Sequence, residues 1–183
     1  MSKGCSSLPV SGETTFTYDA SGRLLSIAGA GAATYEYDGR DRLRAVVSGG
    51  ERTDPAYDAF DMLSAFTRRG RRVELVWDTS QSTAQLAEYR VDGRRVRVAA
   101  GPLGAEALSG DVRGNIVLDP LGTPMGVISA DGTFEAAPVR TAFGELIEGA
   151  ELELPIGFHG RPLIDGRHAW MEHRVYDTSL GRF

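Results

Sequence analysis

The sequence predicts an all-β protein built from repeated antiparallel β-hairpins. Three observations point to this fold class. An aromatic-Asp pair recurs about every twenty residues, short stretches alternate apolar and polar residues, and 23 glycines are spread along the 183-residue chain beside Asp, Ser and Asn. Glycines in such company are typical of turns rather than of linkers. Many turns in a short chain imply many short elements, which favours β structure.

Four aromatic-Asp pairs define the repeat, and they are separated by 19, 20 and 20 residues. The pairs are Tyr18-Asp19, Tyr37-Asp38, Tyr57-Asp58 and Trp77-Asp78. After each of the first three pairs a leucine follows five residues past the aspartate, at Leu24, Leu43 and Leu63. A fixed period of this kind indicates structural units that stack on one another.

Each unit is predicted to form one β-hairpin. In TFTYDASGRLLSI, residues 15–27, Phe16 and Tyr18 alternate with threonines, which is the period-two pattern of a strand with one buried face. The carboxylate of Asp19 can accept hydrogen bonds from backbone N–H groups two or three residues further on, which closes an Asx-type turn. Gly22 can supply a positive φ at the tip of this turn without steric cost.

The second and third units carry Asp41 and Asp61 where the first unit has Gly22. Aspartate tolerates the left-handed backbone better than most residues, so the same turn is expected there. Because one hairpin alone is only marginally stable, successive hairpins are expected to lie side by side in one sheet. The repeat is therefore interpreted as scaffolding, in which the aromatic ring packs and the aspartate caps the turn.

Charge and composition argue against several classes of protein. Residues 1–100 carry 14 basic and 13 acidic residues, and residues 101–183 carry 6 and 12. A nucleic-acid-binding protein is normally basic over a whole face. Cys5 is the single cysteine, so the fold does not depend on an internal disulfide. No apolar run approaches the roughly 18 residues of a membrane span. Residues 1–13 lack the apolar centre of a secretory signal and are expected to be a flexible segment.

Four aspartates raise the question of an aspartyl-protease pair, in which two carboxyl groups share one proton at close range. They are Asp119, Asp131, Asp165 and Asp177. Asp131 stands in an Asp-Gly turn, and Asp177 follows Tyr176 as the aspartates of the repeat follow their aromatic residues. These aspartates are therefore interpreted as turn residues.

The three histidines, His159, His168 and His173, do not predict a metal site. A strand would place His168 and His173 on opposite faces, because they are five residues apart. No cysteine lies near them to complete a zinc site. We expect neither a metal nor a cofactor.

Four arginines surround Gly70: Arg68, Arg69, Arg71 and Arg72. Their place between LSAF and VELVW predicts the tip of a hairpin, where solvated charges are expected. The alternative is a surface that binds phosphate or an acidic partner.

The rest of the chain resembles a known family. VELVWDTSQSTAQLAEYRVDG, residues 73–93, is similar to the segment that follows the repeats in Rhs/YD-repeat proteins. LDPLGTPMGVISADGTFEAAPVRTAFGEL, residues 118–146, and IGFHGRPLIDGRHAWMEHRVYDTSLGRF, residues 156–183, resemble the repeat-associated core domain of that family. The residues that carry this core motif are Gly122, Pro124, Gly144, Gly160, Arg161, Arg174, Tyr176, Asp177, Gly181, Arg182 and Phe183.

The resemblance implies a fold and a role. Rhs/YD-repeat proteins coil a continuous β-sheet into a hollow shell, and in bacterial toxins, including the C subunits of Tc complexes, the shell encloses a C-terminal toxin. The resemblance divides this chain into YD-repeat hairpins at residues 14–100 and a core-associated block at residues 101–183. It also implies a self-cleaving aspartyl-protease segment, which is expected beyond Phe183, so we expect no catalysis from these residues.

The function expected from this resemblance is that of a shell segment in an Rhs-type polymorphic toxin system, which helps to enclose or deliver a toxin. Expected partners are an upstream shell segment, a toxin polypeptide or copies of the chain, with neither nucleic acid nor a membrane span. The expected location is the bacterial cytoplasm, followed by export through a specialised machine.

Two alternatives stay open. One is a surface module that binds carbohydrate or a receptor, which requires Tyr35, Tyr57 or Trp77 to face solvent. The other is the remnant of a self-cleaving aspartyl-protease core.

Overall fold

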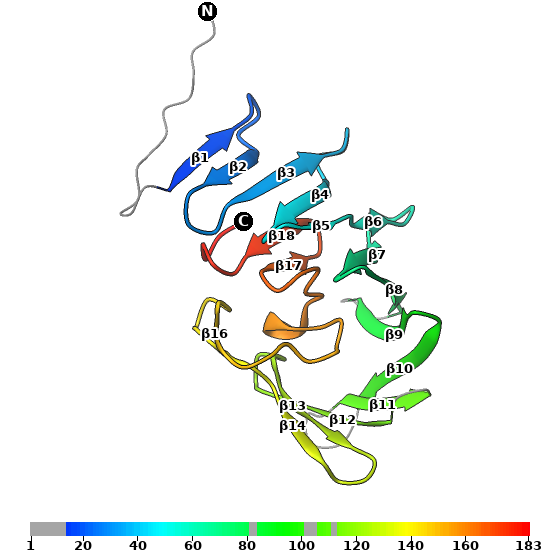
Figure 1. Ribbon diagram of the computed structural model, residues 1–183. Helices are drawn as coiled ribbons and strands as arrows, with labels where there is room; N and C mark the ends of the chain where they lie inside the picture. Colours follow the sequence, from blue (N-terminus) through cyan, green and yellow to red (C-terminus); the bar gives the residue numbers. More distant parts are fainter. Residues whose placement is uncertain (1–13, 81–83, 101–105, 111–112) are drawn as a thin grey trace, which may run out of the picture. The chain divides into compact units, whose positions relative to one another are not determined.

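The computed structural model describes residues 14–80, 84–100, 106–110 and 113–183 (Figure 1). The chain divides into two compact units, residues 1–55 and residues 56–183. The segment 1–13, predicted to be flexible, lies outside the described residues. In the described part of the chain, no helix is long and apolar enough to cross a membrane.

The first unit contains a five-stranded antiparallel sheet whose strands follow one another in chain order. The strands are β1 (Thr15–Tyr18), β2 (Leu24–Ala28), β3 (Ala33–Tyr37), β4 (Leu43–Ser48) and β5 (Glu51–Thr53). On β3, Ala33 and Tyr35 are buried while Thr34 and Glu36 are exposed, and Ile27 of β2 joins the buried side. One face of the sheet therefore forms the core of this unit.

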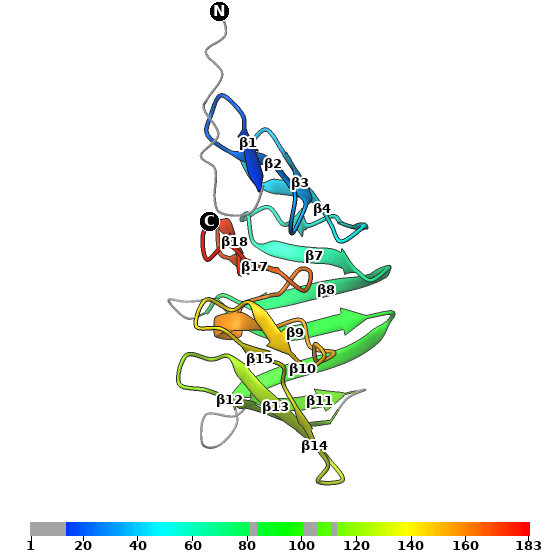
Figure 2. The ribbon, with the colours of Figure 1, turned by 60° about the vertical axis from the view of Figure 1, so that its left-hand side comes forward.

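The second unit contains a nine-stranded sheet, again in chain order, from β6 to β14. The strands are β6 (Ala56–Tyr57), β7 (Leu63–Arg68), β8 (Arg71–Asp78), β9 (Gln85–Val91), β10 (Arg94–Ala100), β11 (Glu106–Gly110), β12 (Gly114–Leu118), β13 (Pro124–Ser129) and β14 (Phe134–Ala136). Figure 2 shows the strands from β7 to β14 side by side. Because β6 and β14 do not pair with each other, the sheet stays open at both ends.

The nine-stranded sheet runs across the boundary predicted at residue 100. Strand β10 pairs with β11 in a register that extends from Val96 opposite Gly110 to Ala100 opposite Glu106. The division into compact units instead falls after Pro55. The division into residues 14–100 and 101–183 stays a prediction about sequence blocks.

The last part of the chain contains two short hairpins, and the second of them packs against this sheet. The hairpins are β15 (Val139–Arg140) with β16 (Leu146–Glu148), and β17 (His168–Met171) with β18 (Arg174–Asp177). The ring of Trp170 on β17 lies 5.5 Å from that of Trp77 on β8. Leu163 and Ile164, just before β17, are almost completely buried. The segment that follows β14, called the C-terminal block below, therefore shares one hydrophobic core with the nine-stranded sheet.

The predicted all-β class of antiparallel hairpins is confirmed. The expectation that successive hairpins lie in one sheet is wrong, because β1–β5 and β6–β14 form separate sheets. The strands form antiparallel hairpins in open sheets that are not closed into a barrel. Within the described residues, helical structure amounts to the three-residue 3₁₀ segment η2 (Phe158–Gly160).

Candidate functional site

The aspartates of the first three aromatic-Asp pairs lie in turns between two strands, and Asp78 is the last residue of β8. At Asp19, Oδ1 accepts hydrogen bonds of 2.9 Å from the backbone N–H of Ser21 and 2.9 Å from that of Arg23. The N–H of Gly22 donates to the carbonyl of Asp19 over 3.1 Å, and the N–H of Asp19 donates to the carbonyl of Arg23 over 3.0 Å. One carboxylate oxygen thus pairs two N–H groups that the tight turn would otherwise leave without a protein partner.

The same turn recurs along the chain. The carboxylates of Asp38, Asp58 and Asp119 each accept hydrogen bonds of 2.8–3.0 Å from the N–H groups two and four residues further on. Asp78 accepts one of 2.9 Å from Ser80, and residues 81–83 lie outside the described ranges. These contacts are those of an Asx-type turn, except that the second N–H comes from four residues on rather than three.

In the turns that begin at Asp19, Asp38, Asp58 and Asp119, the fourth residue has a left-handed backbone. Gly22 and Gly122 have φ values of 82° and 84°, and Asp41 and Asp61 both have φ of 63°. Aspartate is among the few residues with a side chain that adopt this conformation at modest cost. The interpretation of Asp41 and Asp61 as replacements for the turn glycine is therefore confirmed.

A further copy of this turn was not predicted from the sequence, because a threonine replaces the aspartate. Thr141 Oγ1 accepts hydrogen bonds from the N–H groups of Phe143 over 3.3 Å and of Glu145 over 3.1 Å. Gly144 follows as the fourth residue, with φ of 90°. The signal that could have identified it is a hydroxyl side chain three residues before a glycine.

The aromatic members of the pairs are packed rather than displayed. All four of these aromatic side chains are partly buried: Tyr18, Tyr37, Tyr57 and Trp77. The indole N–H of Trp77 also donates a 2.6 Å hydrogen bond to the carbonyl of Leu63. Tyr35 is only 7% exposed. None of the three aromatic residues that a surface-binding module would need is therefore exposed.

The glycines of the core motif all have a left-handed backbone. Gly122, Gly144, Gly160 and Gly181 have φ values between 65° and 90°. At Gly144 an added Cβ would also lie 2.7 Å from the Phe158 ring, so this position has no room for a side chain. The glycine is required there by packing as well as by backbone conformation.

Three other core-motif residues, Tyr176, Arg174 and Phe183, lie in or beside the β17–β18 hairpin. The ring of Tyr176 stacks on Phe158 at 5.9 Å and meets the edge of Phe183 at 5.3 Å. The Arg174 guanidinium lies 3.9 Å from the centroid of the Phe183 ring. Arg174 and Phe183 thus form a cation–π pair at the end of the chain.

Three further core-motif residues connect neighbouring turns and strands. Pro124 is buried at the start of β13. Arg161 pairs with Glu172 at 3.2 Å. The carbonyl of Arg182 accepts a 2.8 Å hydrogen bond from the N–H of Asp177, which closes the turn after β18.

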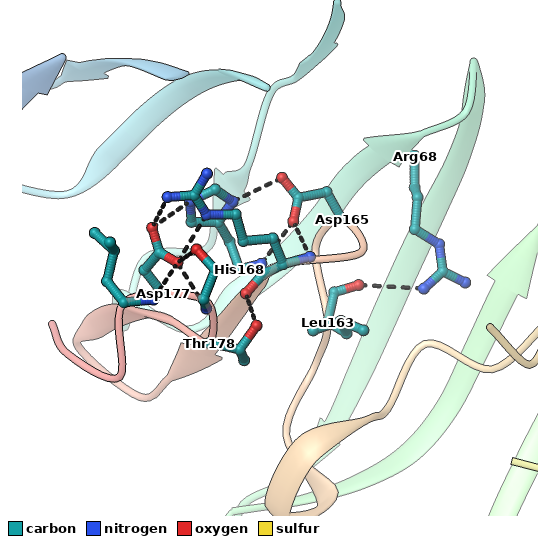
Figure 3. Close-up of polar contacts among 9 residues, drawn as sticks. Arg68, Leu163, Asp165, His168, Asp177 and Thr178 are labelled. Atoms are coloured by element: carbon teal, nitrogen blue, oxygen red, sulfur yellow. Dashed lines mark hydrogen bonds and ion pairs between the residues drawn. The ribbon is translucent and has the colours of Figure 1, made fainter. Parts of the chain in front are cut away.

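A buried polar cluster centred on His168 is the most unusual feature of this block (Figure 3). His168 is 1% exposed, its Nδ1 lies 2.7 Å from Asp165 Oδ2, and its Nε2 lies 3.5 Å from Asp177 Oδ2. Arg167 donates to Asp177 through Nε over 2.7 Å and through Nη2 over 2.6 Å. The Thr178 hydroxyl donates to the carbonyl of Arg167 over 2.8 Å. The cluster joins the loop before β17 to the turn after β18.

Burial alone would favour the neutral form of each group in this cluster, but the contacts reverse that effect. Burial acts to lower the pKa of His168, yet the hydrogen bonds with Asp165 and Asp177 raise that pKa above its ordinary value. Burial acts to raise the pKa of both aspartates, yet the hydrogen bond with His168 holds both pKa values below the ordinary range. Arg167 lowers the pKa of Asp177 further.

This charge state differs from that of an aspartyl-protease dyad. Such a dyad needs two adjacent carboxyl groups that share one proton, which raises the pKa of one of them. Here the pKa values of both carboxyl groups are lowered, and the imidazole that lies between them has a raised pKa. The geometry is that of an ion-pair network that holds the C-terminal hairpin. Asp131 is a turn residue, since its Oδ1 accepts a hydrogen bond of 2.9 Å from the backbone N–H of Thr133.

The histidines are arranged differently from the expectation. Met171 pairs directly with Arg174, so Glu172 and His173 form the loop of the β17–β18 hairpin. The argument that His168 and His173 lie on opposite faces of one strand is therefore wrong, because the strand ends before His173. The structure places His168 in the core and His173 on the surface. Among the described residues, no group of three or more His, Cys, Asp or Glu could hold a metal ion.

Residues 18–53 match the family model of the RHS repeat. This stretch contains the Tyr18 and Tyr37 pairs and the turns at Asp19 and Asp38. The match confirms the resemblance to Rhs/YD-repeat proteins over this stretch of the chain. Residues 18–53 therefore contain an RHS repeat.

Solved structures with similarity to this chain include two crystal structures of large complexes. For TcdB2-TccC3-TEV the TM-score is 0.43 with 14% identity, and for TcdB2-TccC3 without its hypervariable C-terminal region the TM-score is 0.41 with 15% identity. Both alignments cover 94% of this chain and 9% of the other. The chain thus spans less than a tenth of the length of these proteins. No curated protein matches it.

Proposed function

We propose that the chain is a structural segment of a shell in an Rhs-type polymorphic toxin system, where it helps to enclose or deliver a toxin polypeptide. The observation that carries this proposal is the repetition of one aspartate turn between successive strands of open sheets. Each turn adds another strand in chain order, so further repeats can extend such a sheet to any length. The RHS repeat at residues 18–53 supports it independently.

In this role the chain acts by excluding other molecules, without turnover. The ion pairs around His168 and the aromatic contacts of Tyr176 give the C-terminal hairpin a fixed place against β8. The partners are an upstream shell segment, the toxin polypeptide or further copies of the chain. The shell is made in the bacterial cytoplasm and exported by a specialised machine.

The open edge of the second sheet is suited to such partners. The N–H of Ala137 donates to the carbonyl of Met125 on β13 over 2.9 Å. Because N–H groups alternate in direction along a strand, those of Phe134 and Ala136 point away from β13. An edge that offers unpaired donors invites another strand to pair with it.

Multi-angle light scattering of the purified chain over a range of concentrations tests the proposal. We expect self-association that increases with concentration and that Ala136→Pro weakens, because proline removes an outward N–H. Ala136→Gly changes the same side chain, keeps the N–H and should still associate. A monomer at every concentration would contradict the shell role and favour a free-standing binding module.

A further inference from the structure

A pocket of about 440 Å³ opens beside the β7–β8 hairpin in the second unit. Four arginines line it: Arg68, Arg69, Arg71 and Arg94. Two glutamates, Glu135 and Glu153, also line it, so its charged lining is mostly basic in a chain whose net charge is −5. Apolar side chains such as Val73, Tyr89 and Leu108 complete the lining.

The hairpin places an arginine where folding alone would favour another residue. Arg68 pairs with Arg71, so Arg69 and Gly70 form a two-residue loop with φ values of 52° and 71°. Loops with two left-handed residues prefer Asn-Gly or Asp-Gly, since a longer side chain at the first position is strained. Backbone strain of this kind is often found at functional sites.

The pairing at the base of the loop is also unfavourable by itself. Arg68 and Arg71 are direct cross-strand neighbours, and like charges in such positions repel each other. Arg71 is neutralised by Asp92 at 2.6 Å and Glu153 at 3.0 Å. Arg68 instead donates to the carbonyls of Leu154 over 2.9 Å and Leu163 over 3.3 Å, which are neutral groups.

The environment of Arg68 differs from that of a solvated surface arginine. Its side chain is partly buried, and burial lowers its pKa below the ordinary value. The two hydrogen bonds that it makes within the described residues leave further N–H groups of its guanidinium for a ligand. A guanidinium in such a setting binds a carboxylate more strongly than one in bulk water does.

We propose that this pocket binds an acidic segment of a polypeptide, with a carboxylate on Arg68 and Arg69 and a neighbouring apolar side chain against Val73 and Tyr89. The arginines of the lining favour a negatively charged ligand, and its apolar side chains favour a peptide over a bare inorganic anion. The proposal does not rest on the shell role. Light scattering measures self-association, which tests the shell role. A peptide titration measures occupancy of the pocket, so either proposal can fail without the other.

The test is fluorescence anisotropy with a labelled peptide of alternating Glu and Leu, and with a matched peptide in which Gln replaces every Glu. We expect saturable binding of the Glu peptide that weakens as salt is added, and binding of the Gln peptide that is at least about tenfold weaker. Inorganic phosphate at matched ionic strength should displace the Glu peptide only weakly. Equal binding of both peptides, or displacement by phosphate as effective as by free Glu peptide, would overturn the proposal.

Two arginine variants localise the binding. Arg69→Asn suits the left-handed loop, so the variant should fold at least as well as the parent, yet bind the Glu peptide about threefold to fivefold more weakly. Arg72→Asn is the matched control, because Arg72 lies in the same cluster but faces Glu74 at 3.4 Å and does not line the pocket. The proposal is wrong if the two variants lose affinity equally, or if Arg69→Asn loses none.

Discussion

Arg167 binds Asp177 through two hydrogen bonds, of 2.7 Å from Nε and 2.6 Å from Nη2. Asp177 also accepts hydrogen bonds from the N–H of Ser179 over 3.0 Å and from its hydroxyl over 2.8 Å. A single carboxylate therefore caps the last turn, pairs with a guanidinium and faces His168.

Asp177→Asn should destabilise the second unit by about 3–5 kcal/mol, because it leaves the partly buried Arg167 without its anionic partner and takes one of two carboxylates from the buried His168. Urea unfolding followed by tryptophan fluorescence measures this, since both tryptophans, Trp77 and Trp170, lie in this unit. Asp131→Asn is the control: the residue is exposed and Asn keeps the turn acceptor, so a change within about 0.5 kcal/mol is expected. Equal effects of the two changes would contradict the role of the cluster.

Stability should depend on pH through His168. Its pKa is raised in the fold, so its contribution is complete below the unfolded value of about 6.5 and is lost as pH rises through the higher folded pKa. Asp165 and Asp177 have lowered pKa values, so their contribution is present above about pH 3.9 and is lost as pH falls towards their folded values.

The second unit should therefore be most stable between about pH 4 and pH 6.5 and lose stability on the alkaline side. Thermal unfolding between pH 4 and pH 9 measures the profile. His168→Gln removes the titrating group, so its profile should be lower at pH 5 and flatter above pH 6. If stability fell as steeply above pH 6 in this variant as in the parent, groups other than His168 would cause the alkaline loss.

The aspartate turn can be tested at Asp58, whose carboxylate accepts hydrogen bonds from Phe60 over 2.8 Å and Met62 over 3.0 Å. Asp58→Ala should cost about 1–2 kcal/mol in the urea unfolding free energy, as the loss of comparable side-chain caps does. Asp58→Asn keeps a carbonyl oxygen in the same place and should cost a few tenths of that. If both variants were as stable as the parent, the turn would not depend on this side chain.

Two glycines with the same backbone separate conformation from packing. Gly132 and Gly144 have φ of 88° and 90°, but an added Cβ would touch nothing within 4 Å at Gly132 and would lie 2.7 Å from Phe158 at Gly144. Gly132→Ala should cost about 1 kcal/mol for the left-handed backbone. Gly144→Ala should cost about 1–3 kcal/mol more, because it overpacks the core. Differential scanning calorimetry of both variants measures the difference, and similar melting temperatures would contradict it.

The elements predicted well are those whose cause lies within a few residues. The turn at Asp19 needs only an acceptor, two N–H groups and a residue with positive φ, all within residues 19–23. The same logic identified Asp41 and Asp61 before their backbone was known. Thr141 was missed because the repeat was defined by its aspartate rather than by any side chain that can accept two hydrogen bonds.

The candidate site was predicted less well, because its members come together only through tertiary packing. Asp165 and Asp177 were interpreted as turn residues, but their common contact with His168 depends on how the β17–β18 hairpin folds back. Likewise, the four clustered arginines suggested one surface. The structure separates Arg68, whose guanidinium donates to the carbonyls of Leu154 and Leu163, from Arg72, which is exposed beside Glu74.

The sequence by itself determined the antiparallel hairpins of the repeat and their aspartate turns, because period-two alternation and Asp or Gly in the turns act over five residues or fewer. Only the tertiary structure decided where the compact units divide and which charges become buried together. Those outcomes depend on side chains as far apart as Trp77 and Trp170, which meet at 5.5 Å. No local pattern encodes that contact, because it arises when the C-terminal block packs against the sheet.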